Sequence, residues 1–121
     1  MLKRPIHSLI RRMSTMPFTV PDTPTARVIA AKITSNLKPE HLEIFNDSSK
    51  HAHHAAMRGS SNITESHFRL VIVSDIFEGK NAPSRHRMVY DLLKEELSAP
   101  NGVHALQLQT KTPSEFSKLH Q

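Results

Sequence analysis

Three of the chain's nine histidines fall within four positions, in the stretch SSKHAHHAAMRGSSN that begins at Ser48. These are His51, His53 and His54, and the residues around them are too polar to build a core. Because imidazole is the commonest metal ligand in proteins, the stretch is a candidate metal-binding loop. The alternative is a solvated loop with no ligand role, since scattered histidines outnumber metal sites.

The chain contains no cysteine, which restricts the metal chemistry open to it. Disulfides, thiol nucleophiles and all-thiolate metal sites are excluded. Iron–sulfur clusters take mostly thiolate ligands, although imidazole replaces thiolates on one iron of a Rieske centre. If this chain handles such a cluster, it therefore holds one side only, and a partner brings the thiolates. Ligation would depend on pH, because a protonated imidazole does not coordinate.

A zinc-dependent hydrolase is another use for clustered histidines, and the sequence argues against it. A catalytic zinc site has three ordered protein ligands with an acid or base nearby. Here the candidates crowd one loop, and no H-E-x-x-H motif or nucleophile–base signature occurs. We therefore expect a protein that is not an enzyme, with no catalytic residues.

The segments around this loop predict one α+β domain over residues 22–121, in the order α-β-β-α-β-α. The first helix follows Thr23 as cap, with Pro24 at the first helical position, and ends before Pro39. Alternating or β-branched runs predict three strands, HLEIFND (41–47), SHFRLVIVS (66–74) and VHALQLQTK (103–111). Helical spacing predicts two later helices, SRHRMVYDLLKEEL (84–97) and TPSEFSKL (112–119).

The order of these elements predicts a three-stranded mixed sheet with helices on one face. The first two strands are joined by the histidine loop and are expected to be antiparallel. The second and third strands are separated by a helix, so a right-handed crossover should make them parallel. No apolar run reaches the roughly 20 residues that a membrane-spanning helix needs.

Residues 1–21 differ in composition from the rest and predict a mitochondrial transit peptide with a linker. Of the sixteen basic residues four lie in the first twelve positions, and the first acidic residue is Asp22. The remainder carries twelve basic and eleven acidic residues, a net charge of +1. Arg, Ser and Thr without acid are typical of transit peptides. The alternative is a disordered basic tail, and later starts at Met13 or Met16 would give a cytosolic form.

The motifs SHF, F-x-G, RHR, HAL and KTP occur in this order within ESHFRLVIVSDIFEGK, RHRMVYDLLKEEL and VHALQLQTKTPSEF. Together they resemble the BolA family from about Thr25 to Phe116. Phe116 stands where the family usually has Trp, so an aromatic anchor is retained. The histidine loop is longer than is usual for the family. The resemblance implies a fold related to class II KH domains.

The resemblance also implies a partner and a cargo. BolA proteins pair with monothiol glutaredoxins in iron–sulfur cluster handling, and pass clusters toward iron–sulfur client proteins. A bridging [2Fe–2S] cluster then takes thiolates from the glutaredoxin and from glutathione. Carried over to this chain, the BolA-side ligands are His104 in VHAL and His51 in NDSSKH, with His53 and His54 as alternative loop ligands. A loop histidine in place of cysteine resembles the mitochondrial branch.

His104 and His67 also have simpler interpretations as strand residues. His104 shares strand parity with Leu106 and Leu108, so it can also pack at the end of a core strand. His67 is expected to be a strand residue and not a further metal ligand.

Arg85, His86 and Arg87 form a small basic patch at the start of a helix, which we expect to contact a partner's acidic surface. A nucleic-acid-binding or transcription-regulating KH-like module is the alternative function. A KH domain clamps nucleic acid with a GxxG loop, but the glycines here, Gly59, Gly79 and Gly102, are isolated. The domain charge near +1 also offers little attraction to phosphate.

Overall fold

The computed structural model describes residues 18–48 and 65–119. The predicted transit peptide up to residue 17 and the loop histidines His51, His53 and His54 lie outside the described residues. No helix in the described ranges is long and apolar enough to cross a membrane.

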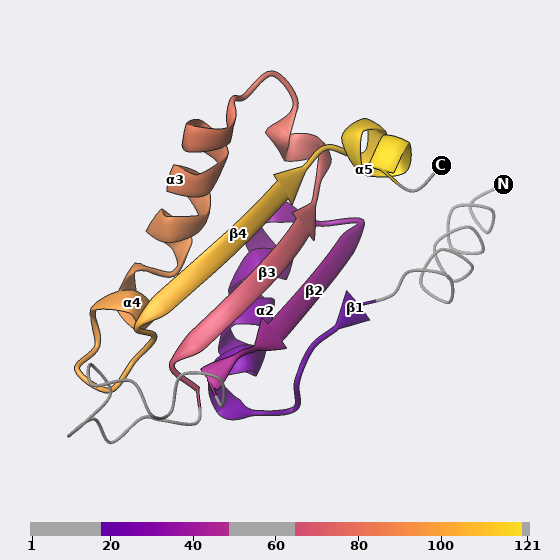
Figure 1. Ribbon diagram of the computed structural model, residues 1–121. Helices are drawn as coiled ribbons and strands as arrows, with labels where there is room; N and C mark the ends of the chain where they lie inside the picture. The colour runs from indigo at the N-terminus through magenta and orange to yellow at the C-terminus, as the bar shows by residue number, and fades with distance from the viewer. Residues whose placement is uncertain (1–17, 49–64, 120–121) are drawn as a thin grey trace, which may run out of the picture.

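Four strands form one mixed sheet in the order β1-β2-β3-β4 (Figure 1). β2 (His41–Asn46) and β3 (His67–Val73) are antiparallel. β4 (Ala105–Lys111) is parallel to β3, which confirms the predicted topology of these three strands. The predicted strand count was wrong by one, because β1 (Phe18–Thr19) pairs in parallel with β2. Two residues show no periodicity, so β1 is defined by its pairing alone.

The α+β class is confirmed, with α2 (Pro24–Leu37) and α3 (Ala82–Leu92) on one face of the sheet (Figure 1). Alternate residues of β2 and β3 point toward these helices, as the pleat requires. The resulting core joins buried side chains of α2, β2, β3 and α3: Ile29, Ile33, Leu37, Leu42, Ile44, Phe68, Leu70, Ile72 and Val89.

The helix predicted over 84–97 is two helices in the structure. α3 begins earlier than predicted, because the Asn81 side chain caps it by accepting from the Ser84 N–H at 3.0 Å. The chain leaves helical geometry at Leu93, with φ −102° and ψ 19°, and α4 (Lys94–Ser98) follows. Leu93, at the break, is buried in the core. Helical periodicity in the sequence does not reveal this break.

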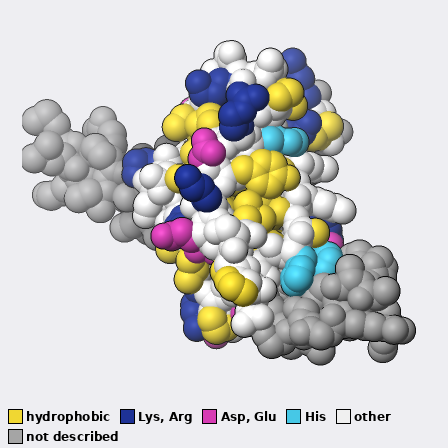
Figure 2. All heavy atoms as spheres, turned by 90° about the vertical axis from the view of Figure 1, so that its left-hand side faces the viewer, with side chains coloured by type: hydrophobic (Ala, Val, Ile, Leu, Met, Phe, Trp, Pro, Cys, Tyr) yellow, Lys and Arg dark blue, Asp and Glu magenta, His cyan; other side chains and the backbone are white. Residues whose placement is uncertain are grey.

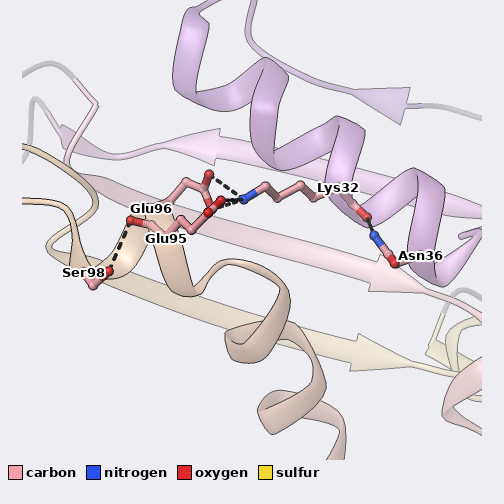
Figure 3. Close-up of polar contacts among 5 residues, drawn as sticks. All are labelled: Lys32, Asn36, Glu95, Glu96 and Ser98. Carbon is pink, nitrogen blue, oxygen red and sulfur yellow. Dashed lines mark hydrogen bonds and ion pairs between the residues drawn. The ribbon is translucent and has the colours of Figure 1, made fainter.

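Lys32 joins α2 to α4 (Figure 3). Its Nζ lies 2.9 Å from Glu95 Oε1 and 2.8 Å from Glu96 Oε2. Hydrogen bonds to Glu96 and Glu95 raise the pKa of Lys32, and the bond from Lys32 lowers the pKa of Glu95. These contacts tie the first helix to the segment that leads into β4.

Two short helical segments complete the described chain. η3 (Asp75–Phe77) follows β3, and α5 (Pro113–Leu119) follows β4. The Phe116 ring of α5 lies 4.7 Å from the His41 ring between centroids. Phe116 therefore packs an aromatic side chain against β2.

Candidate functional site

His104 lies at the surface directly before β4, with its backbone fixed on both sides. Its N–H donates to the Ser66 carbonyl at 2.7 Å, and the Ala105 N–H donates to the same oxygen at 3.1 Å. The preceding Val103 is buried and donates its N–H to the Glu96 carbonyl at 2.9 Å. The arrangement presents an imidazole to solvent from a well-anchored main chain.

A second imidazole, that of His67, stacks on His104. The ring centroids are 6.2 Å apart and the ring planes differ by 15°. His67 is the first residue of β3 and pairs with Ala105, the neighbour of His104 in the chain. The prediction that His67 is a strand residue is confirmed, but its contact with His104 was missed. The contact follows from the β3–β4 register. His67 and His104 are thirty-seven positions apart in the sequence, so local sequence patterns do not reveal it.

The two described ends of the histidine loop, Ser48 and Glu65, are held close to this pair. Ser48 Oγ accepts from the Ser66 N–H at 2.8 Å and from the His67 N–H at 3.1 Å. Ser48 and Ser66 are both buried. Since Ser66 also accepts from His104, the loop that carries His51 begins and ends beside His104.

Glu65 connects the loop end to α2. Its carboxylate accepts from the Thr25 N–H and the Ala26 N–H, each at 3.1 Å. Burial would raise the pKa of Glu65, but hydrogen bonds, among them those from these two amides, outweigh it and lower the pKa. Thr23 occupies the N-cap position as predicted, yet its side chain makes no capping bond to the helix. Glu65 performs that role from 40 residues away.

The described residues contain no group of three or more His, Asp or Glu side chains arranged to hold a metal ion. The chain also has no thiolate to offer. What the described part of the site provides is one exposed imidazole, His104, with a second imidazole stacked upon it. This donor set fits the side of a cluster or metal centre whose other ligands belong to another molecule.

The basic patch predicted from Arg85, His86 and Arg87 needs correction at Arg85. Its guanidinium is buried and donates to the Lys80 carbonyl at 2.8 Å and to the Thr110 carbonyl at 3.0 Å. It also binds both carboxylate oxygens of Glu115, at 2.7 and 3.1 Å. Four acceptors satisfy Arg85 inside the protein, so it is a structural residue and not a surface contact.

Arg85 also perturbs the acid that it binds. Its hydrogen bond, together with one from the Thr112 N–H, lowers the pKa of Glu115 to about 2. His86 remains half-buried and Arg87 exposed. Figure 2 shows basic side chains gathered at the end of the molecule where α3 begins, with histidine atoms beside them and further histidine atoms at the opposite end, where β4 begins.

The fold and the site together define an α+β protein that presents imidazole at the start of the edge strand β4. The sequence model of the family described as BolA-like protein matches residues 33–115. The chain belongs to the BolA-like family.

Relatives and solved structures agree with this assignment. The UV-induced protein uvi31 of Schizosaccharomyces pombe is 48% identical over 86 residues, which are 70% of this chain and 82% of that protein. SufE-like protein 1, chloroplastic/mitochondrial, of Arabidopsis thaliana is 49% identical over 88 residues, 72% of this chain but only 23% of that protein. The structure of BolA1 from Arabidopsis thaliana superposes with a TM-score of 0.65 at 44% identity, over 78% of this chain and 97% of that one.

Proposed function

We propose that this chain is a non-enzymatic iron–sulfur cluster assembly or transfer factor that pairs with a monothiol glutaredoxin. In the pair, it co-ligates a bridging [2Fe–2S] cluster, its cargo, through histidine. One observation carries the proposal: His104 is exposed on a fixed backbone, hydrogen-bonded to Ser66 beside the base of the histidine loop. In a chain without cysteine, that imidazole suits a centre whose thiolates come from the partner.

His104 is the first proposed ligand, and a loop histidine is the second. His51 is the preferred candidate, with His53 and His54 as alternatives. The glutaredoxin and glutathione supply the sulfur donors. His86 and Arg87 remain proposed contacts for an acidic partner surface, whereas Arg85 is withdrawn from that set because it is buried.

Imidazole ligation has two consequences for the cargo. Two neutral imidazoles opposite two thiolates leave the cluster less anionic than four thiolates, which raises its reduction potential. Ligation also weakens in acid, because protonation occupies the coordinating nitrogen. Both properties suit a cluster that is held in order to be passed on to a client protein.

We propose the mitochondrial matrix as the site of action. The acid-free, Arg-containing leader supports this, and one relative carries the words chloroplastic/mitochondrial in its name. A form that starts at Met13 or Met16 would lack most of the leader and remain in the cytosol.

The test is a spectroscopic titration of the full chain with a monothiol glutaredoxin, glutathione and a reconstituted [2Fe–2S] cluster. We expect a 1:1 heterodimer whose visible absorption and CD spectra differ from those of the glutaredoxin homodimer. His104→Ala and His51→Ala should each abolish the distinctive spectrum while the heterodimer persists. His120→Ala, which removes a histidine with no proposed role, is the control and should change nothing.

Other results would contradict the proposal. Loss of the heterodimer itself in His104→Ala would recast this residue as a docking contact. A stable cluster on the chain alone, without thiol or glutathione, would show that the thiolates are not needed. An unchanged spectrum with no heterodimer would remove the proposed function altogether.

A further inference from the structure

We propose that His67 is a positioning residue: it holds the His104 imidazole in one orientation by ring contact, without binding the metal itself. The inference rests on the proposed function, since it concerns how His104 is presented to the cluster. It starts from the stacked rings of the two histidines at the beginning of β3 and β4.

The geometry favours a stacking role for His67 over a ligand role. A centroid separation of 6.2 Å lies within the range of attractive aromatic pairs. The two ring planes are within 15° of parallel. One His67 nitrogen, Nδ1, lies 2.8 Å from Ser66 Oγ, and the His67 side chain is half-buried, whereas His104 is exposed. His67 is therefore placed to contact the His104 ring and is the less accessible nitrogen donor of the two.

His67 is held at both its ring and its backbone. Its Nδ1 lies 2.8 Å from Ser66 Oγ, and its backbone N–H donates to Ser48 Oγ at 3.1 Å. It is half-buried and belongs to β3, which is paired on both sides. A ring fixed in this way can orient a neighbour.

His104, in contrast, lies just outside the β3–β4 ladder, and its side chain is exposed. Only some rotamers of an exposed histidine direct a nitrogen toward a docked partner. Outer partners that orient a metal-binding imidazole are a general feature of metal sites. The stacked His67 ring supplies such an orienting contact, and Ser66 supports it twice, through its carbonyl to His104 and its hydroxyl to His67.

Two substitutions separate a ring contact from a nitrogen ligand. His67→Ala removes both the ring and its nitrogens, whereas His67→Phe keeps a flat ring and removes the nitrogens. If His67 acts by stacking, Phe should rescue what Ala loses. Arg69→Ala is the matched control, because Arg69 lies two residues along the same strand on the same face.

The first measurement uses NMR on the full chain alone. We expect cross-relaxation between the His67 and His104 rings, and side-chain couplings of His104 that indicate one χ1 rotamer. His67→Ala should average these couplings, while His67→Phe and Arg69→Ala should leave them as in the wild type. Unchanged couplings in His67→Ala, or averaged couplings in the wild type, would overturn the positioning role.

The second measurement uses the heterodimer with its cluster. His67→Ala should shift the CD bands while the heterodimer is retained. It should also shorten the cluster lifetime by about tenfold, the lower end of the range for loss of a residue that orients a metal ligand. His67→Phe should resemble the wild type. If His67→Phe is as damaging as His67→Ala and pulsed EPR of the reduced cluster loses one histidine nitrogen coupling, His67 is a ligand and the inference is wrong. If no wild-type heterodimer forms, the proposed function fails, and the NMR measurement alone decides the role of His67.

Discussion

The two ends of β4 differ: exposed His104 precedes its first residue, whereas buried Arg85 donates to the Thr110 carbonyl near its last. His104 reaches solvent, with its backbone bonded to Ser66 and its ring beside that of His67. Arg85 is withdrawn from solvent, and its side chain binds Lys80, Thr110 and Glu115. Both residues belong to histidine- and arginine-containing motifs that suggest function. Only the one that is left exposed on a fixed backbone is available to a partner.

The difference follows from where each donor finds its acceptors. A guanidinium carries five N–H donors and is costly to bury unless most of them are satisfied. α3, β4 and α5 meet around Arg85 and supply the acceptors, so the charge stabilises the junction. The His104 ring lies at the surface directly before β4, so it is accessible to a partner.

The largest expected effect is on the Arg85 side of this comparison. Arg85→Ala leaves the Thr110 and Lys80 carbonyls without their donor and should lower the free energy of unfolding by about 2–3 kcal/mol. Urea denaturation monitored by far-UV CD measures this change. Arg87→Ala, in the same helix but exposed, and His104→Ala should each stay within about 0.5 kcal/mol of the wild type. Equal losses in all three variants would erase the distinction between the two ends.

The next effect is at the opposite end, where Glu65 caps α2. Glu65→Ala removes the acceptor of the Thr25 and Ala26 amides and should cost about 1 kcal/mol. Amide hydrogen exchange at Ser66 and His104 should accelerate in the same variant, because Glu65 ties that segment to α2. Glu65→Gln retains a carbonyl acceptor and should lose less. Unchanged exchange at Ser66 would show that the cap does not support the histidine site.

A smaller, pH-dependent effect belongs to Glu115. Its pKa is lowered from 4.5 to about 2 in the folded protein, so its contribution to stability is fully present above pH 4.5. That contribution is lost as the pH falls from 4.5 toward about 2. Urea midpoints measured across this window should fall more steeply in the wild type than in Glu115→Gln. Added salt should shrink the difference, since 44% of the Glu115 side chain is exposed. Parallel pH profiles for the two proteins would contradict this role.

The smallest effect is expected at the contact between α2 and α4. Lys32→Met removes the ion pairs with Glu95 and Glu96 and should lower the thermal midpoint slightly at low salt and not at high salt. Lys94→Met, at an exposed lysine of α4, controls for the loss of one positive charge. A salt-independent loss would contradict an electrostatic role for Lys32.

Local patterns predicted most of the fold. β-Branched residues in β3, alternation in β4 and helical spacing in α2 placed these elements correctly, because each presents one face to a single core. The misses were features without a local pattern. β1 is two residues long, and the break at Leu93 lies within a helix-forming run.

The site divides in the same way. His104 was identified from its motif, and the structure shows that its side chain is exposed, while its ligand role stays a prediction. His67 was set aside, and Arg85 was assigned to the surface, because their environments depend on residues that are distant in the sequence. His67 meets His104 only through the β3–β4 register, and Arg85 meets Glu115 only once α5 returns beside α3.

The sequence by itself determined that any thiolate chemistry must come from outside, since the chain has no cysteine, and it determined the order of helices and strands. These are properties of composition and of near neighbours. Only the tertiary structure decided which histidines face each other and which arginine is buried. Burial and ring contact arise between segments tens of residues apart, and strand register fixes which side chains meet there.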